Sequence, residues 1–171
     1  CIRDSGSTTP LVSLTTDQPG SVAINGSTVE TSGAQTYNDV LSMDKDTTLT
    51  ASVVNFNAAV TGAGSLTVDG ITKFQAATVT TNGAQLYKGA VELISNTVLT
   101  ANTVAGVDSD VTFDSTINGA RTLSIVSAGD TTFSGAVGNT APLASLSTDQ
   151  PGSVAINGST VTTSGEQTYD D

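Results

Sequence analysis

The chain of 171 residues contains no histidine, no tryptophan, one cysteine, and only five lysine and arginine residues together. Without histidine it has no Ser/His or Cys/His nucleophile pair, no imidazole metal ligand, and no general base whose ordinary pKa lies near neutrality. A single cysteine, Cys1, excludes an internal disulfide. These absences remove most enzyme classes, and we predict that the protein is not an enzyme.

Basic residues are also scarce, and the formal net charge is −11 at neutral pH. Binding to nucleic acids depends on lysine and arginine contacts to phosphate, so we expect no nucleic-acid partner. No apolar run reaches the roughly 18 residues that a membrane-spanning helix needs, so we expect no membrane span. A basic segment followed by an apolar core is absent, and we expect any signal peptide to lie outside this chain. Cys1 is either the acylated first residue of a lipoprotein or an ordinary boundary residue.

What the chain has in abundance is threonine and serine. Good helix formers such as glutamate, lysine and arginine are rare, whereas threonine, valine and isoleucine occur in short segments separated by glycine and asparagine. The hydrophobic fraction of 37% exceeds that of a disordered acidic segment. The composition therefore predicts a folded, all-β protein.

Internal repeats organise the whole chain. Residues 10–39 recur at 142–171 with 25 of 30 positions identical, and the same offset of 132 matches 1–39 to 133–171. A weaker copy relates 29–51 to 79–101, with 10 of 23 positions identical, and a third similarity relates segments that begin at Phe56 and Phe113. Because these offsets differ, we infer that the true unit is a shorter coil. Division of the long repeat into six coils gives roughly 22 residues per coil.

Alternation of inward and outward residues supports strands throughout. One phase runs through Val29, Tyr37, Leu41 and Leu49 to Val53, and the opposite phase begins at Phe56. A period of two is typical of β-strands, and each change of phase lies near a glycine, asparagine or short polar segment. Asn-Gly pairs at 25–26, 82–83, 118–119 and 157–158 indicate tight turns, of which the first and last would equally suit projecting hairpins.

Two all-β architectures compete for this pattern. Immunoglobulin-like sandwiches need about 100 residues per module, which fits none of the offsets. A parallel β-helix, or β-solenoid, stacks short strands coil upon coil around a narrow core and arranges threonine and asparagine in ladders. We therefore predict a single β-solenoid segment spanning 1–171, with coils of roughly 20–25 residues and projecting hairpins as an open alternative.

The motifs resemble those of a protein family. The element Gly-x-Gln-x-Tyr occurs at 33–37, 83–87 and 165–169, and Thr-x-Leu-Thr-Ala occurs at 47–51 and 97–101. Together with the segments that begin at Phe56 and Phe113, they resemble the repeat regions of filamentous-haemagglutinin-like secreted surface proteins of Gram-negative bacteria. This resemblance implies a right-handed parallel β-helix shaft, an extracellular or cell-surface location, and an adhesive or fibre-forming role.

The candidate chemical sites are few. Asp108, Asp110 and Asp114 form the densest acidic group and are weak calcium candidates, because calcium prefers several oxygen ligands. Asp44 and Asp46 form a smaller group, which the weaker repeat does not preserve. A carbohydrate-active or carbohydrate-binding β-helix is the alternative function, and it would need clustered carboxylates or a basic residue on one face. We predict neither catalytic residues nor a bound cofactor.

The expected function follows from the architecture. A solenoid is stabilised by stacking of neighbouring coils, so its ends expose unpaired strand edges. We predict a structural or adhesive segment of a bacterial surface fibre. Its expected partners are other copies, through end-to-end stacking, or the continuation of a longer repeat array. Host or surface glycans are a further candidate partner.

Overall fold

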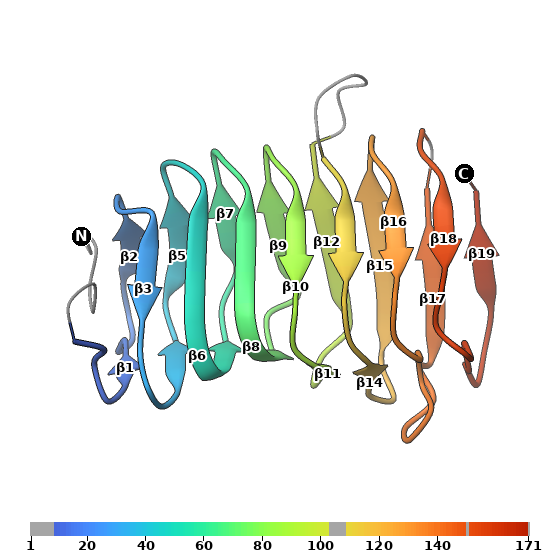
Figure 1. The fold of residues 1–171 in the computed structure, drawn as a ribbon, viewed down its shortest axis with the longest axis horizontal. Helices are drawn as coiled ribbons and strands as arrows, with labels where there is room; N and C mark the ends of the chain where they lie inside the picture. The colour runs from blue at the N-terminus through green and yellow to red at the C-terminus, as the bar shows by residue number, and fades with distance from the viewer. Residues whose placement is uncertain (1–8, 103–108, 150, 171) are drawn as a thin grey trace.

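The computed structural model describes residues 9–102, 109–149 and 151–170. Within these ranges the chain forms 19 β-strands and no helix, and neighbouring strands pair in parallel. Strands of successive coils lie side by side along one long axis, with the first and last coils at opposite ends (Figure 1). The predicted β-solenoid is thereby confirmed.

One side of the solenoid, which we call the first face, is an eight-stranded parallel sheet. Its inward residues, such as Leu41, Val60 and Val79, are fully buried and lie in register on adjacent strands. In spatial order its strands are β19 (Gln167–Tyr169), β17 (Ser145–Thr148), β15 (Thr122–Ser127), β12 (Thr97–Ala101), β9 (Thr78–Thr81), β7 (Val60–Gly62), β5 (Val40–Met43) and β2 (Ser21–Ile24).

The remaining strands form an 11-stranded sheet that bends around the core as two faces. The second face comprises β3 (Thr28–Glu30), the first halves of β6 (Thr47–Phe56) and β8 (Leu66–Phe74), β10 (Gln85–Tyr87), β13 (Val111–Phe113), β16 (Thr131–Phe133) and β18 (Val154–Ile156). The third face comprises β1 (Leu14–Thr15), β4 (Gln35–Tyr37), the second halves of β6 and β8, β11 (Val91–Leu93) and β14 (Ile117–Asn118). The coils from β2 to β14 therefore contribute one strand to each face, whereas the next two coils have only isolated bridges on the third face, at Val137 and Val161.

The bend between the second and third faces explains one change of phase in the sequence. The pairing of β6 with β8 shifts register between Thr50 and Val53. As a result Val54, not Val53, points inward and is fully buried, so the predicted phase was wrong at Val53. The opposing strand β8 bends at Gly70, whose φ of 149° lies in the region that favours glycine. A local irregularity of this kind adds one residue and turns the strand.

Gly70 provides a direct test of this corner. A Cβ at Gly70 would collide with the backbone carbonyl oxygen of Ala51. We expect Gly70→Ala to lower the free energy of unfolding by about 2 kcal/mol, because steric conflict adds to an unfavourable φ. Denaturant unfolding measures this loss. Gly20→Ala is the control, since a Cβ there meets only the side chain of Asp39, at 3.3 Å. Equal stability of the two variants would contradict the strained corner.

A buried threonine on the same strand provides a second test. Thr72 is fully buried on β8, and its hydroxyl has no hydrogen-bond partner among the described residues. We expect Thr72→Val to raise the free energy of unfolding by about 1 kcal/mol, because a buried polar group without a partner is destabilising. Thr97→Val should instead lower it, since the Thr97 hydroxyl donates to the Ser95 carbonyl at 3.0 Å. Thermal unfolding of both variants decides the matter, and destabilisation by Thr72→Val would refute the expectation.

The coils differ in length more than the sequence suggested. The short coil that leads from Leu41 to its first-face partner Val60 contrasts with the long coil that leads from Leu99 to its partner Ile125. The observed lengths extend slightly beyond the predicted roughly 20–25 residues at both extremes. The Asn-Gly pairs at 25–26 and 157–158 join strands of different faces, so they form corners and not the projecting hairpins considered as an alternative.

The near-identical repeats do not occupy equivalent places. Six successive first-face pairings lead from Val22 to Thr148, and Val154, the sequence equivalent of Val22, follows on the second face. Likewise β4 lies in the 11-stranded sheet, whereas its copy β19 lies in the eight-stranded one. The long sequence repeat therefore spans six coils plus one face.

Aromatic side chains form a single stack through the core. Neighbouring rings lie 5.2–5.9 Å apart, and five successive pairs connect six residues: Tyr37, Phe56, Phe74, Tyr87, Phe113 and Phe133. All six are almost completely buried. The stack passes from the third face to the second between Phe74 and Tyr87, where the rings meet edge to face.

Candidate functional site

The most distinctive constellation of polar side chains surrounds the repeated Gly-x-Gln-x-Tyr element. In its first copy Gln35 is fully buried at the start of β4, where its side-chain amide donates to the carbonyl oxygens of Val29 and Thr50, both at 3.0 Å. The hydroxyl of Tyr37 donates to Gln35 Oε1 at 2.8 Å. The glutamine side chain thus satisfies backbone groups at a corner and orients the tyrosine.

The second copy builds the same arrangement on another face. Gln85, also fully buried, donates to Thr81 Oγ1 at 3.1 Å and to the Thr100 carbonyl at 2.9 Å. Tyr87 donates to Gln85 Oε1 at 2.8 Å, as Tyr37 does to Gln35. The motif therefore forms similar contacts on the second and third faces, so its arrangement does not depend on which face it occupies. The sequence pattern marked it as a motif but indicated no role for its glutamine.

The tyrosines of this element belong to the core and do not offer a surface for sugar stacking, except at the C-terminal coil. Tyr37 and Tyr87 are fully buried, whereas Tyr169 in the third copy is 36% exposed. Tyr169 still donates to Gln167 Oε1, at 3.1 Å. The hydrogen-bonded pair therefore forms even where the coil has no covering layer.

Burial of the two core tyrosines makes the stability depend on alkaline pH. Desolvation raises the pKa of Tyr37 and of Tyr87 well above the ordinary tyrosine value of about 10. Below that value both folded and unfolded chains hold the protons, and stability does not change. Above it the unfolded chain ionises first, so we expect a loss of about 1.4 kcal/mol per pH unit for each tyrosine. Denaturant midpoints between about pH 8 and 11 measure the loss, and tyrosinate absorbance of the native chain near pH 10 from these two residues would contradict it.

Only two of the three calcium candidates, Asp110 and Asp114, lie within the described residues. Asp108 lies outside them. Asp110 Oδ1 accepts the backbone N–H of Asp130 at 2.8 Å. Neither Asp114 nor any other described residue completes a group of three or more acidic, histidine or cysteine side chains that could hold a metal.

Acidic and amide side chains have a different role at the corners, where they connect adjacent coils. Asp46 Oδ1 accepts the N–H of Ser65 at 2.8 Å, and Asp149 Oδ1 accepts that of Ser127 at 3.0 Å. Asparagines add ladders of the predicted kind, with Asn57 Nδ2 donating to Asn38 Oδ1 at 2.7 Å. Asp46 and Asp149 therefore lie at positions that join one coil to the next.

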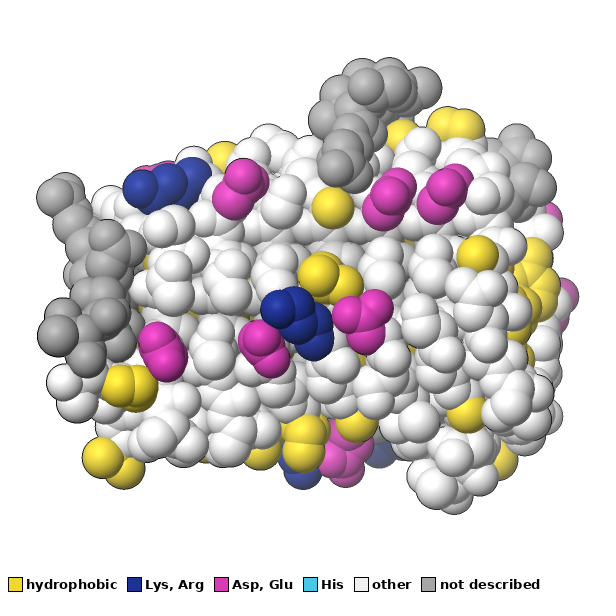
Figure 2. All heavy atoms as spheres, in the orientation of Figure 1, with side chains coloured by type: hydrophobic (Ala, Val, Ile, Leu, Met, Phe, Trp, Pro, Cys, Tyr) yellow, Lys and Arg dark blue, Asp and Glu magenta, His cyan; other side chains and the backbone are white. Residues whose placement is uncertain are grey.

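Two of the few basic residues are engaged in similar contacts between coils. Lys73 forms an ion pair with Glu92 at 2.7 Å, and Lys88 forms one with Asp69 at 3.1 Å. Their side chains are about half exposed, and Figure 2 shows scattered charged side chains of both signs on a largely uncharged surface. Because both lysines are paired with a carboxylate of the neighbouring coil, their arrangement gives no support to a carbohydrate-cleaving site.

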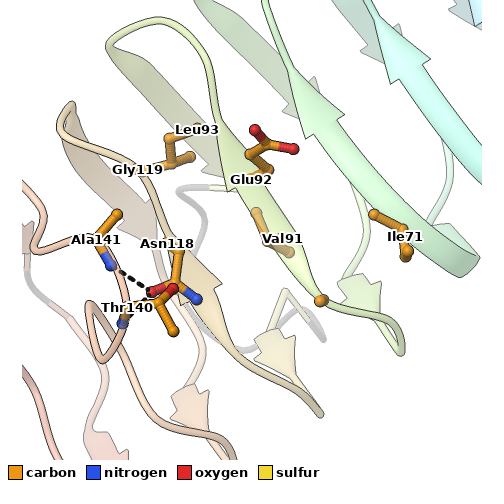
Figure 3. Close-up of a pocket in the computed structure, with 9 residues that line it drawn as sticks. Ile71, Val91, Glu92, Leu93, Asn118, Gly119, Thr140 and Ala141 are labelled. Carbon is orange, nitrogen blue, oxygen red and sulfur yellow. Dashed lines mark hydrogen bonds between the residues drawn. The ribbon is translucent and has the colours of Figure 1, made fainter.

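A shallow groove of about 320 Å³ lies on the third face near β11 and β14. Ile71, Val91 and the loop at 140–141 line it, with Glu92 at its edge (Figure 3). Its most central polar group is the side-chain oxygen of Asn118, which accepts the backbone N–H groups of Thr140 at 3.0 Å and Ala141 at 3.2 Å. The Asn118 side chain in the groove is therefore engaged in fixing the position of the loop at 140–141.

The first face differs from the others in carrying no charge at the outward positions of its described strands. One rank across four strands consists of Ser42, Thr61, Thr80 and Thr100. Its neighbours at the two ends of the rank are Ala23 and Val126. The outward side of this face is therefore rich in hydroxyl and methyl groups, and a shallow hollow lies beside the rank at Ser42, Thr61 and Thr80. The strand propensity of threonine alone accounts for its abundance here.

Comparison of the chain with known proteins finds no matching family model, curated protein or solved structure. The resemblance to filamentous-haemagglutinin-like repeats accordingly depends on the sequence motifs alone. A search of the described residues also finds no helix that could cross a membrane. The polar residues of the site therefore have a structural role: buried glutamine–tyrosine pairs and corner carboxylates connect adjacent coils.

Proposed function

We propose that the chain is a rigid shaft segment of an extracellular bacterial surface fibre or adhesin. The observation that carries this proposal is the continuity of the core, in which six aromatic rings stack without interruption between Tyr37 and Phe133. Because each coil packs on its neighbours through this continuous core, bending between coils would separate buried rings, which is the resistance that a shaft requires.

The polar chemistry supports the same function. The buried polar side chains Gln35 and Gln85 and the corner residues Asp46 and Asp110 all bond to the chain itself. A net charge of −11 keeps neighbouring shafts from associating side by side. Secretion, a surface location and adhesion belong to the proposal, as do its partners, namely other copies, further repeats of an array, or surface glycans.

A length measurement tests the shaft directly. Residues 40–171 are appended after Asp171, which aligns with Asp39, so that a second repeat unit follows the first. With strands about 4.8 Å apart, six added coils should lengthen the particle by about 29 Å at unchanged cross-section. Small-angle scattering of the original and extended chains measures both quantities. A jointed or globular extended particle would overturn the shaft function.

A further inference from the structure

The buried glutamine–tyrosine strands have a fixed order of layers. Beneath Gln85 and Tyr87 lies a Leu-x-Val strand, and above them lies Val111-x-Phe113, residue on residue. Above Gln35 and Tyr37 lies Val54-x-Phe56 in the same register. Both buried copies are thus covered by a strand of the form Val-x-Phe.

The covering coil also completes the hydrogen bonds of the glutamine. Gln35 donates to the carbonyl of Thr50, and Gln85 donates to that of Thr100, in each case a residue 15 positions further along the chain. This acceptor lies in the next coil. A Gly-x-Gln-x-Tyr strand therefore specifies two features of its neighbour, a carbonyl oxygen for the glutamine and an apolar pair over the glutamine and tyrosine.

The third copy has only the layer beneath it. Leu146 and Thr148 pair with Gln167 and Tyr169, and both hydrogen bonds of the Gln167 amide group go to its own coil. Tyr169 is 36% exposed and Ile156 is 45% exposed. Figure 2 shows hydrophobic side chains gathered at this end of the molecule.

The opposite end differs, because its first complete coil is already covered. Ile24 and Val29, which point inward from β2 and β3, have no exposed surface. None of the strands described in that coil has the form Val-x-Phe. The described residues at that end therefore do not offer the Val-x-Phe layer that covers the buried copies.

We propose that the C-terminal coil (151–170) is a docking surface for one further solenoid coil of the type formed by residues 40–58, supplied by a following repeat unit. Residues 153–171 correspond in sequence to 21–39, which residues 40–58 cover in this structure. The docked coil places a Val-x-Phe strand over Gln167 and Tyr169 and offers a backbone carbonyl to Gln167. This inference rests on the proposed shaft function and adds the identity of the layer that continues it.

The test compares the full chain with a version in which residues 40–58 follow Asp171 directly. Amide hydrogen exchange of residues 167–169 should slow by about tenfold or more, because the exposed strand edge becomes paired. The control carries the same extension with Val54→Asp and Phe56→Asp in the appended copy only, which leaves the original coils unchanged. In the control the exchange should stay as fast as in the original chain.

The outcomes separate this inference from the shaft function. Equal exchange in the extended and control chains overturns the docking inference, whereas the length measurement on the longer array judges the shaft independently. Protection that rises with protein concentration in the unextended chain would assign the surface to a second copy and would equally overturn it. Slower exchange in the extended chain alone supports the specified layer.

Discussion

Replacing Phe113 with alanine should lower the free energy of unfolding by about 4 kcal/mol. The Phe113 ring stacks on Tyr87 at 5.2 Å and on Phe133 at 5.5 Å, so its loss removes two ring contacts and leaves a cavity between them. Each coil contacts only its neighbours, so a central cavity also weakens the coupling between the two halves of the rod. Denaturant unfolding with two probes, far-ultraviolet circular dichroism and tyrosine fluorescence, measures both effects.

Ile71→Ala serves as the matched control for this prediction. Ile71 is also hydrophobic and lies on a strand of the 11-stranded sheet, but it is 43% exposed and points away from the core. Its replacement should cost less than about 1 kcal/mol. Similar losses for Phe113→Ala and Ile71→Ala would show that the aromatic stack is not the main source of stability.

A second large effect is expected at the buried glutamine. Gln85→Leu should lower the free energy of unfolding by about 3 kcal/mol, because the side chain keeps its approximate size but loses its hydrogen bonds to Thr81, Tyr87 and Thr100. The Tyr87 hydroxyl then remains buried without its acceptor, and the partly buried Thr100 carbonyl loses its donor. Thermal and denaturant unfolding report the change, and the tyrosine near-ultraviolet signal reports the altered surroundings of Tyr87.

The repeat supplies its own control in Gln167→Leu. Gln167 belongs to the same motif and bonds to Thr163 and Tyr169, yet it is exposed at the uncovered end. Water can replace its hydrogen bonds, so the loss should stay below about 0.5 kcal/mol. If Gln167→Leu destabilised the chain as strongly as Gln85→Leu, the effect would arise from the local corner and not from burial between coils.

Much of the architecture could be predicted from the sequence, because alternation of side chains directly reports which residues point inward. Val29, Leu49, Phe56 and Phe113 were assigned inward and are buried. The repeat offsets, which fit no sandwich module, also favoured coils that stack in parallel. These signals are local, and a solenoid is built from local units.

The features that escaped prediction depend on the lengths of corners. A single added residue between Thr50 and Val53 moved the inward position to Val54. Coils differ in length, as the short coil from Leu41 to Val60 shows beside the longer one from Leu99 to Ile125. The summed length of the coils between two repeat copies decides on which face the second copy lies. No pattern in one coil fixes the length of the next. Sequence identity therefore could not reveal that β4 and β19 lie in different sheets.

The contacts of the acidic residues could not be predicted from the sequence. Asp46, Asp110 and Asp149 accept backbone N–H groups of a neighbouring coil. Such contacts join residues that are a full coil apart in the sequence, so only the register of the coils reveals them. The same holds for Gln35 and Gln85, whose acceptors belong partly to the next coil.

The mismatch between repeat period and coil has a consequence for what such a shaft displays. Thr28 in β3 and its sequence equivalent Thr160 lie one face apart around the solenoid axis. With three faces per coil, this is a rotation of roughly a third of a revolution. If further units followed with the same period, three of them would distribute one epitope or contact residue around the whole circumference. In the proposed shaft, a partner that approached from any side would then meet the same residues.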